Sequence, residues 1–252
     1  MITIKSEREL DFMRKAGAIT GGILDELTDM VKPGVTTSEL DFYAESRCKD
    51  YGVIPAFKGY QDFPATLCIS INSEIVHGIP SPKRKLAEGD IVGIDFGVIY
   101  EGWFGDSART YPVGKIDEKA QNLLRVTDES LHRGIEQCVP GNRLFDIGHA
   151  VQNFVEGHGY SVVREFVGHG IGRALHEDPQ VPNYGPKGKG SVLKVGMVLA
   201  IEPMVNIGSP DVKVLADGWT AVTIDNSLSA HFEHTVAITA KGPEILTIRN
   251  KG

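Results

Sequence analysis

Apolar residues recur at every third or fourth position between Leu10 and Leu27, which is the spacing of one buried helix face. Ser6 and Glu9 precede this stripe with the spacing of a capping box. The pattern predicts a helix over residues 7–31, ended by Pro33-Gly34. A second helix is predicted over residues 37–51, before Gly52.

The next segment changes from helical to strand-like periodicity. Polar and apolar residues alternate over residues 66–77, which predicts a strand. Two further strands are predicted over residues 91–100 and 103–112. Glu101-Gly102 between them is a turn sequence typical of a β-hairpin.

The second part of the chain repeats this order. Helices are predicted over residues 117–138 and 144–158, followed by strands near residues 160–168, 197–206, 212–224 and 230–240. At one fixed offset Pro33-Gly34 corresponds to Pro140-Gly141, and Asp95 corresponds to Glu202. We therefore predict an α/β fold in one domain, residues 1–252, with an internal duplication of halves at about 1–112 and 113–252.

Composition narrows the class of protein. The 252 residues carry 26 Lys and Arg against 33 Asp and Glu, and a net charge of −7 argues against a protein that coats nucleic acid or anionic membrane. Three cysteines are an odd number, so a disulfide framework is not expected. The N-terminus lacks the apolar segment of a signal peptide, and no apolar run is long enough to span a bilayer. We expect a soluble, cytoplasmic protein.

Four acidic residues and one histidine lie in sequence contexts that predict burial of their side chains away from water. Asp95, Glu202 and Glu233 lie inside apolar runs, Asp106 lies on the partner strand of the predicted hairpin, and His169 lies between glycines. A buried carboxylate costs several kcal/mol unless it is paired or bound to a cation. No Lys or Arg lies within the apolar runs around the first three acids.

Two divalent ions would balance the four carboxylates. Oxygen ligands with one nitrogen suit Mn, Fe, Co or Zn, and two ions about 3–4 Å apart acidify water and polarise a carbonyl in hydrolases. The alternative for each residue alone is a strand-end acid, half of an ion pair, or a histidine satisfied by hydrogen bonds.

Together these segments resemble the type I methionine aminopeptidases, and the resemblance extends over essentially the whole chain. It rests on the segments Met13–Gly17, Cys68–Asn72, Val76–Pro80, Asp95–Asp106, Gly168–Gly172, Leu175–Glu177, Ala200–Met204 and Glu233–Thr235. The resemblance implies a pita-bread fold: a curved, antiparallel-rich sheet flanked by helices, with a pseudo-twofold axis between its halves.

The resemblance also implies a dinuclear metal site. Asp95 would bind one ion, Asp106 and Glu233 would bridge both, and His169 and Glu202 would complete the second. The ions would be Co, Mn, Fe, Zn or Ni. A monovalent cation, Na or K, would bind carbonyl groups of the residues Asn72, Glu74 and Ser229.

Catalytic roles follow from the same resemblance. Glu202 is the candidate base for the attacking water, and His176 would stabilise the oxyanion. His77 would contact the substrate amide. Without the motif context, a structural role for the two histidines is equally compatible with the sequence.

A pocket for the methionine side chain is implied beside these residues. Its candidate residues are Phe57, Tyr60, Phe63, Cys68, His77, Leu175, His176 and Trp219. Aromatic rings and sulfur make favourable contacts, although core packing is the alternative for each apolar member.

The implied activity is removal of N-terminal methionine from peptides and nascent chains, preferably before a small residue. The ribosome is a candidate partner, and the chain is expected to be a monomer without nucleic-acid or membrane function. One alternative is a prolidase or proline-specific aminopeptidase, which shares the ligands but typically has an additional N-terminal domain. A second is a metal-free binding protein on the same fold, which would typically have lost ligands.

Overall fold

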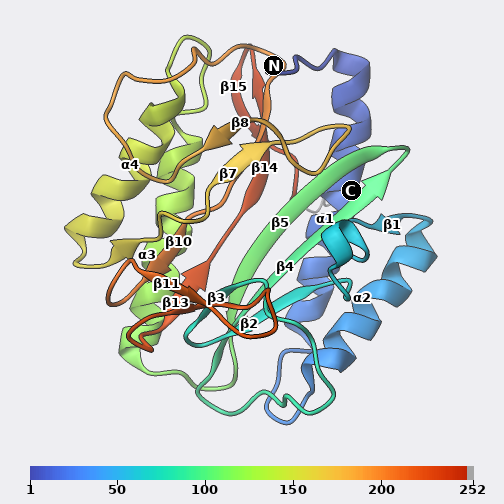
Figure 1. Ribbon diagram of the computed structural model, residues 1–252. Coiled ribbons are helices and arrows are strands. Elements are labelled where there is room, and N and C mark those ends of the chain that lie inside the picture. The colour runs from blue at the N-terminus through green and yellow to red at the C-terminus, as the bar shows by residue number, and fades with distance from the viewer. Residues whose placement is uncertain (249–252) are drawn as a thin grey trace.

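The computed structural model describes residues 1–248, in which helices flank a central set of strands (Figure 1). Two helices precede the hairpin at residues 91–112, and two more follow this hairpin and precede the strands of the second half of the chain. They are α1 (Glu7–Thr28), α2 (Thr37–Tyr51), α3 (Glu118–Ile135) and α4 (Leu144–Gly157), and a short 3₁₀ helix, η1, covers Tyr60–Asp62.

Every strand pair within residues 1–248 is antiparallel. One sheet contains β1 (Ile54–Pro55), β2 (Cys68–Ile71), β4 (Ile91–Tyr100) and β5 (Trp103–Pro112). A five-stranded sheet contains β15 (Gly242–Ile245), β14 (His234–Thr239), β9 (Val198–Ile201), β7 (Gly168–Gly170) and β8 (Glu177–Val181). Two three-stranded sheets contain β13 (Ser229–His231), β10 (Met204–Asn206) and β6 (Ser161–Val162), and β11 (Val212–Val214), β12 (Ala221–Thr223) and β3 (Glu74–Val76).

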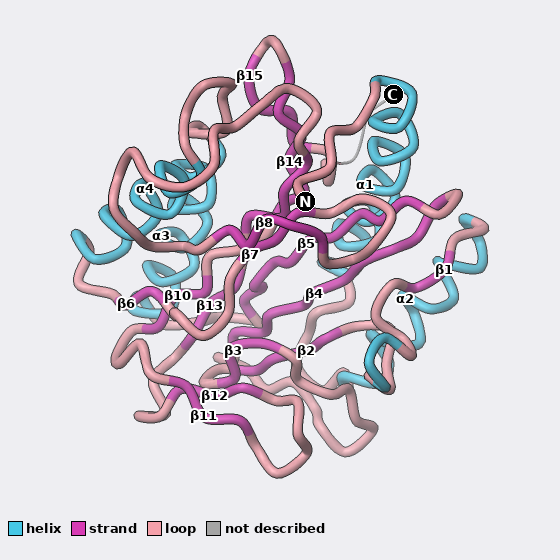
Figure 2. Tube along the Cα trace, turned by 45° about the horizontal axis from the view of Figure 1, so that its top comes forward, coloured by secondary structure: helices cyan, strands magenta, loops and turns pink. Residues whose placement is uncertain are grey.

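The two helix pairs lie on opposite sides of Figure 1, with strands between them, and Figure 2 shows the same arrangement from another angle. Ile23 and Leu24 of α1 and Leu40 of α2 share a buried core with Phe96 of β4. Leu131 of α3 and Ile147 of α4 share another with β9. Because one helix pair packs against the strands of the first half and the other mainly against those of the second, the arrangement supports the predicted duplication, which stays a prediction.

The α/β class and the antiparallel character are confirmed. The hairpin over 91–100 and 103–112 has the predicted bounds, with Glu101 and Gly102 at positive φ values of 50° and 77° in the turn. Helix 37–51 is also as predicted. Three helices end earlier than predicted, at Thr28, Ile135 and Gly157.

Five predicted strands are each divided into two. Residues 66–77 form β2 and β3, because Asn72 takes a positive φ of 57° and the chain turns there. The strand predicted over 197–206 is interrupted at Glu202-Pro203, and that over 230–240 at Phe232-Glu233. Segments 160–168 and 212–224 are divided in the same way, the first into β6 and the start of β7, the second into β11 and β12. Strands β1, β8 and β15 were not predicted.

No helix within the described residues is both long and apolar enough to cross a membrane.

Close packing of α1 on β5 depends on a glycine. A Cβ added to Gly105 would lie 2.7 Å from the backbone nitrogen of Gly17, whereas one added to Gly22, also in α1, would meet nothing within 4 Å. We expect Gly105→Ala to lower the free energy of unfolding by about 1–3 kcal/mol. Gly22→Ala should raise it by up to about 1 kcal/mol. Urea unfolding of both variants measures this, and equal stability would contradict the packing described.

Candidate metal centre and pocket

Two glutamates lie where the chain passes from one sheet to another. Glu202 follows β9 and precedes β10, and Glu233 follows β13 and precedes β14. β9 and β14 are neighbours in the five-stranded sheet, whereas β10 and β13 pair in a three-stranded sheet. Glu202 and Glu233 both lie at the boundary between these two sheets. Their carboxylates therefore lie close together at this boundary.

The two aspartates come from the β4–β5 hairpin. Asp95 is opposite Ala108, and Asp106 is opposite Gly97. Since Asp106 and Ala108 are two residues apart on β5, both aspartates point to the same face of the sheet. The hairpin therefore contributes two acids to one site.

Short hydrogen bonds join the hairpin to the other sheet at this point. The Asp106 backbone N–H donates to Thr235 Oγ1 (3.0 Å), which donates to the Asp106 carbonyl (2.8 Å). Ser107 Oγ donates to the Glu233 carbonyl (2.6 Å), and the Glu233 N–H donates to the Ala108 carbonyl (2.8 Å). The backbones that carry Asp106 and Glu233 are thereby fixed relative to each other.

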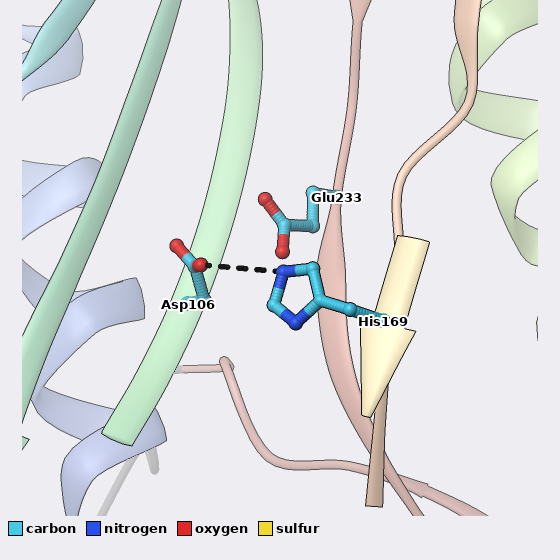
Figure 3. A group of neighbouring side chains, drawn as sticks. All are labelled: Asp106, His169 and Glu233. Carbon is cyan, nitrogen blue, oxygen red and sulfur yellow. Dashed lines mark ion pairs between the residues drawn. The ribbon is translucent and has the colours of Figure 1, made fainter. Parts of the chain in front are cut away.

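His169 completes the group from β7. Its Nδ1 donates to the Gly170 carbonyl (2.9 Å), which leaves Nε2 as the ring acceptor. Nε2 lies 3.9 Å from Asp106 Oδ2 and 3.6 Å from Glu202 Oε1. Figure 3 shows the imidazole directed at Asp106 beside the Glu233 carboxylate.

This group suits a cation because its ligand atoms lie close together and several of its buried oxygens have no hydrogen-bond partner. Ligand atoms of Asp106, His169 and Glu233 all lie within 4.8 Å of one another. Asp95 Oδ1, Asp106 Oδ1 and Glu233 Oε1 are buried without a hydrogen-bond partner. No lysine or arginine lines this cavity among the described residues. Carboxylate oxygens and an imidazole nitrogen with free lone pairs are the ligands that divalent metals take.

Burial and mutual repulsion disturb the protonation of these acids. Burial raises the pKa of Asp95 to about 7. Burial, together with neighbouring acids, raises the pKa values of Asp106, Glu202 and Glu233 well above their usual range. Burial lowers the pKa of His169 to about 4, so its imidazole is neutral at pH 7. Without a cation the cluster therefore retains protons at neutral pH.

The same cavity contains all the predicted pocket residues. Phe57, Tyr60, Phe63, Cys68, His77, Leu175, His176 and Trp219 line it together with all five predicted metal ligands. Phe63 meets Trp219 edge-on, with ring centroids 5.1 Å apart. An apolar, aromatic wall thus faces a cluster of acids.

The two candidate catalytic histidines are held in different ways. His77 has a positive φ of 62°, an unusual conformation for a residue with a Cβ, and its ring lies 6.3 Å from that of Trp219. Tyr60 Oη lies 2.7 Å from His176 Nδ1, and the His176 and His169 ring centroids are 4.3 Å apart. Burial lowers the pKa of both His77, to about 4, and His176.

Two residues near the site were missed from sequence. Gln61 lines the cavity, and the buried His231 places Nε2 3.7 Å from Glu202 Oε2 without a hydrogen-bond partner. His231 precedes Glu233 by two residues, so alternation along a strand was a usable signal. Gln61 left none, because it lies in an irregular turn with a positive φ of 47°.

The candidate monovalent-cation residues are also neighbours. The Ser229 N–H donates to the Asn72 carbonyl (2.9 Å), and Glu74 begins β3 immediately after the turn at Asn72. A cation at these carbonyls stays a prediction.

Comparison with known proteins gives the family. The sequence model of metallopeptidase family M24 matches residues 11–240. The chain belongs to metallopeptidase family M24. It is 55% identical to a methionine aminopeptidase of Clostridium acetobutylicum over 98% of this chain and 99% of the relative. It is 56% identical to methionine aminopeptidase 1 of Bacillus subtilis over the same shares of the two chains. The resemblance to this enzyme group is confirmed.

Solved structures of similar proteins have the same fold as this chain. Methionine aminopeptidase from Thermotoga maritima superposes with a TM-score of 0.97 at 49% identity, covering 98% of this chain and 100% of that one. The prolidase from Pyrococcus horikoshii superposes with a TM-score of 0.77 at 28% identity, and 63% of its chain is covered. The pita-bread fold is confirmed, and the prolidase shares it while being considerably longer.

The contribution of Asp95 to the stability of the metal-free protein should change with pH in one direction. Because the folded-state pKa of Asp95 is raised to about 7, the folded state holds more protons than the unfolded state between about pH 4 and 7. Buried histidines such as His77 and His169, whose pKa values are lowered to about 4, act in the opposite direction below about pH 6.5, so the contribution of Asp95 is taken as the difference between wild type and Asp95→Asn. This difference in the free energy of unfolding should fall as pH rises, by about 2–3 kcal/mol between pH 5 and 8. Chemical unfolding across this range measures it.

Added divalent metal should remove most of that fall, because the metal replaces the protons. A metal-free wild type that gained stability relative to Asp95→Asn from pH 5 to 8 would contradict the raised pKa of Asp95.

Proposed function

We propose that this chain removes N-terminal methionine from peptides and nascent proteins by metal-dependent hydrolysis. The observation that carries the proposal is one cavity in which a cluster of acids with the geometry of a metal site faces an aromatic wall. Full-length similarity to methionine aminopeptidases agrees with it.

The residues fit two divalent ions. Asp95 would hold one, Asp106 and Glu233 would lie between the two, and His169 and Glu202 would hold the second. When bound, the ions supply an acidified water and polarise the scissile carbonyl. Co, Mn, Fe, Zn and Ni all accept such ligands.

The chain's own side chains would then move protons and orient the substrate. Glu202, with a pKa raised by burial, is suited to accept a proton from water. Tyr60 donating to Nδ1 of a neutral His176 leaves the Nε2 N–H free for the carbonyl oxygen of the substrate. His77, beside the Trp219 ring, would contact the amide next to the bond that breaks.

The pocket would hold the methionine side chain. Phe57, Phe63 and Leu175 are buried, and the Cys68 sulfur lies in the same cluster. A thioether makes favourable contacts with aromatic edges and polarisable sulfur. A small residue after methionine is proposed by family resemblance.

Further parts of the proposal concern a monovalent ion, the oligomeric state and the location of the protein. A monovalent ion, Na or K, would bind near Asn72, Glu74 and Ser229. We propose a single-domain, cytoplasmic monomer that meets nascent chains, with the ribosome as a candidate partner and no nucleic-acid or membrane role. Three free, buried cysteines and a net charge of −7 agree with this.

A peptide panel tests the activity. Met-Ala-Ser should be cleaved at least about tenfold faster than Met-Lys-Ser or Xaa-Pro peptides, because the aromatic pocket suits a thioether side chain and family resemblance implies a small residue after methionine. Mass spectrometry of the released residue measures this with Co, Mn, Zn and Fe in turn.

Chelation should abolish cleavage, and added metal should restore it. Preference for Xaa-Pro peptides would favour the prolidase alternative. Full activity in metal-stripped protein would overturn the metallopeptidase mechanism, and absence of both metal binding and hydrolysis would favour the metal-free binding protein.

A further inference from the structure

A lysine near the N-terminus is buried against the turn that carries His176. Lys5 is 4% exposed, and its Nζ lies 2.8 Å from Glu177 Oε2. The Glu177 side chain is only 13% exposed. The pair joins residues 172 positions apart in the chain. A buried ion pair of this kind is costly to break by removing one partner.

Glu177 also closes the turn that precedes it. Its Oε1 accepts from the backbone N–H of Arg173 (2.8 Å) and of Ala174 (3.3 Å). Leu175 and His176 lie within the loop so closed, and both line the active-site cavity. Burial opposes ionisation of Glu177, but hydrogen bonds from Lys5 and from these N–H groups hold its pKa below the usual value.

Lys5 is itself fixed on a rigid part of the fold. Its backbone N–H donates to the Gly196 carbonyl (2.8 Å), and the Gly196 N–H donates to Ile238 of β14 (2.9 Å). A Cβ at Gly172 would lie 2.7 Å from Lys5 Cε, so the lysine stem also touches the first residue of the turn. Through its backbone and its ammonium group, Lys5 therefore links the sheet that contains β14 to the 172–176 turn.

We propose that Lys5 is a positioning residue for this reaction: through Glu177 it holds the 172–176 turn so that His176 and Leu175 face the substrate. The inference rests on the proposed function, because it assigns His176 to the scissile carbonyl. Lys5 does not line the cavity, and its ammonium group pairs with Glu177, so its effect on the site passes through the turn.

Lys5→Met tests this while retaining most of the side-chain volume. kcat for Met-Ala-Ser should fall about tenfold to a hundredfold, because small displacements of a catalytic group cost this much. Mn²⁺ affinity measured by calorimetry should stay within about twofold of wild type, since the ligands lie on other elements. Arg47→Met is the matched control: it removes a cation from the half-buried Glu26, far from the cavity, and should lower Tm without changing kcat.

A double-mutant cycle shows whether Lys5 acts through His176. In a His176→Ala background, Lys5→Met should change kcat by less than about threefold, because the positioned group is already absent. If Lys5→Met fails to fold, the neutral double variant Lys5→Met with Glu177→Gln leaves no unpaired buried charge and should show the same loss of kcat.

Three results would overturn the inference: unchanged kcat in a folded Lys5 variant, an equal loss in the His176→Ala background, or loss of Mn²⁺ affinity in proportion to activity. Wild-type protein that does not cleave Met-Ala-Ser at all would instead overturn the proposed function.

Discussion

Four carboxylates share one buried cavity, and among the described residues no lysine or arginine lines it. Each ionised acid would cost several kcal/mol there, and each neighbour adds repulsion. Three of their oxygens have no hydrogen-bond partner. Only protons or multivalent cations can satisfy such a group, and His169, neutral and with Nε2 directed at the acids, favours the cations.

The fold assembles this cluster at a junction between sheets. Asp95 and Asp106 come from a long, regular hairpin, whereas Glu202 and Glu233 come from interruptions between strands. Thr235 and Ser107 join the two sources through buried hydrogen bonds. Because the candidate ligands lie on both sides of this junction, a bound ion would link the hairpin to the other sheet, and metal binding should stabilise the whole fold.

Regular elements could be predicted from sequence because their signals are local. The 91–112 hairpin has unbroken alternation and a turn sequence, and α2 has a cap at each end. Asp95, Glu202 and Glu233 were recognisable because acids in apolar runs violate the usual pattern. Asp106 was recognisable by its place on the partner strand of the hairpin, and His169 by the glycines around it. Family resemblance, not periodicity, supplied the pocket residues.

Other features depend on contacts that no local pattern records. The strands break at Glu202-Pro203 and Phe232-Glu233 because the chain passes there from one sheet to another. Predicting these breaks requires knowing which strands pair with each other. The Lys5–Glu177 pair joins distant segments, and Lys5 alone looks like an ordinary surface lysine in sequence. His231 lies two residues before Glu233, which is a local signal, but its approach to Glu202 follows from the pairing of β10 with β13.

The central claim is that the acid cluster binds divalent metal. Anomalous diffraction from crystals grown with Mn²⁺ or Co²⁺ tests it most directly, because it locates the ions among named side chains. The account predicts strong peaks between Asp106, Glu233 and His169, with a second site reached by Asp95. Peaks found only elsewhere, or five side chains that turn away from one another with nothing between them, would contradict it.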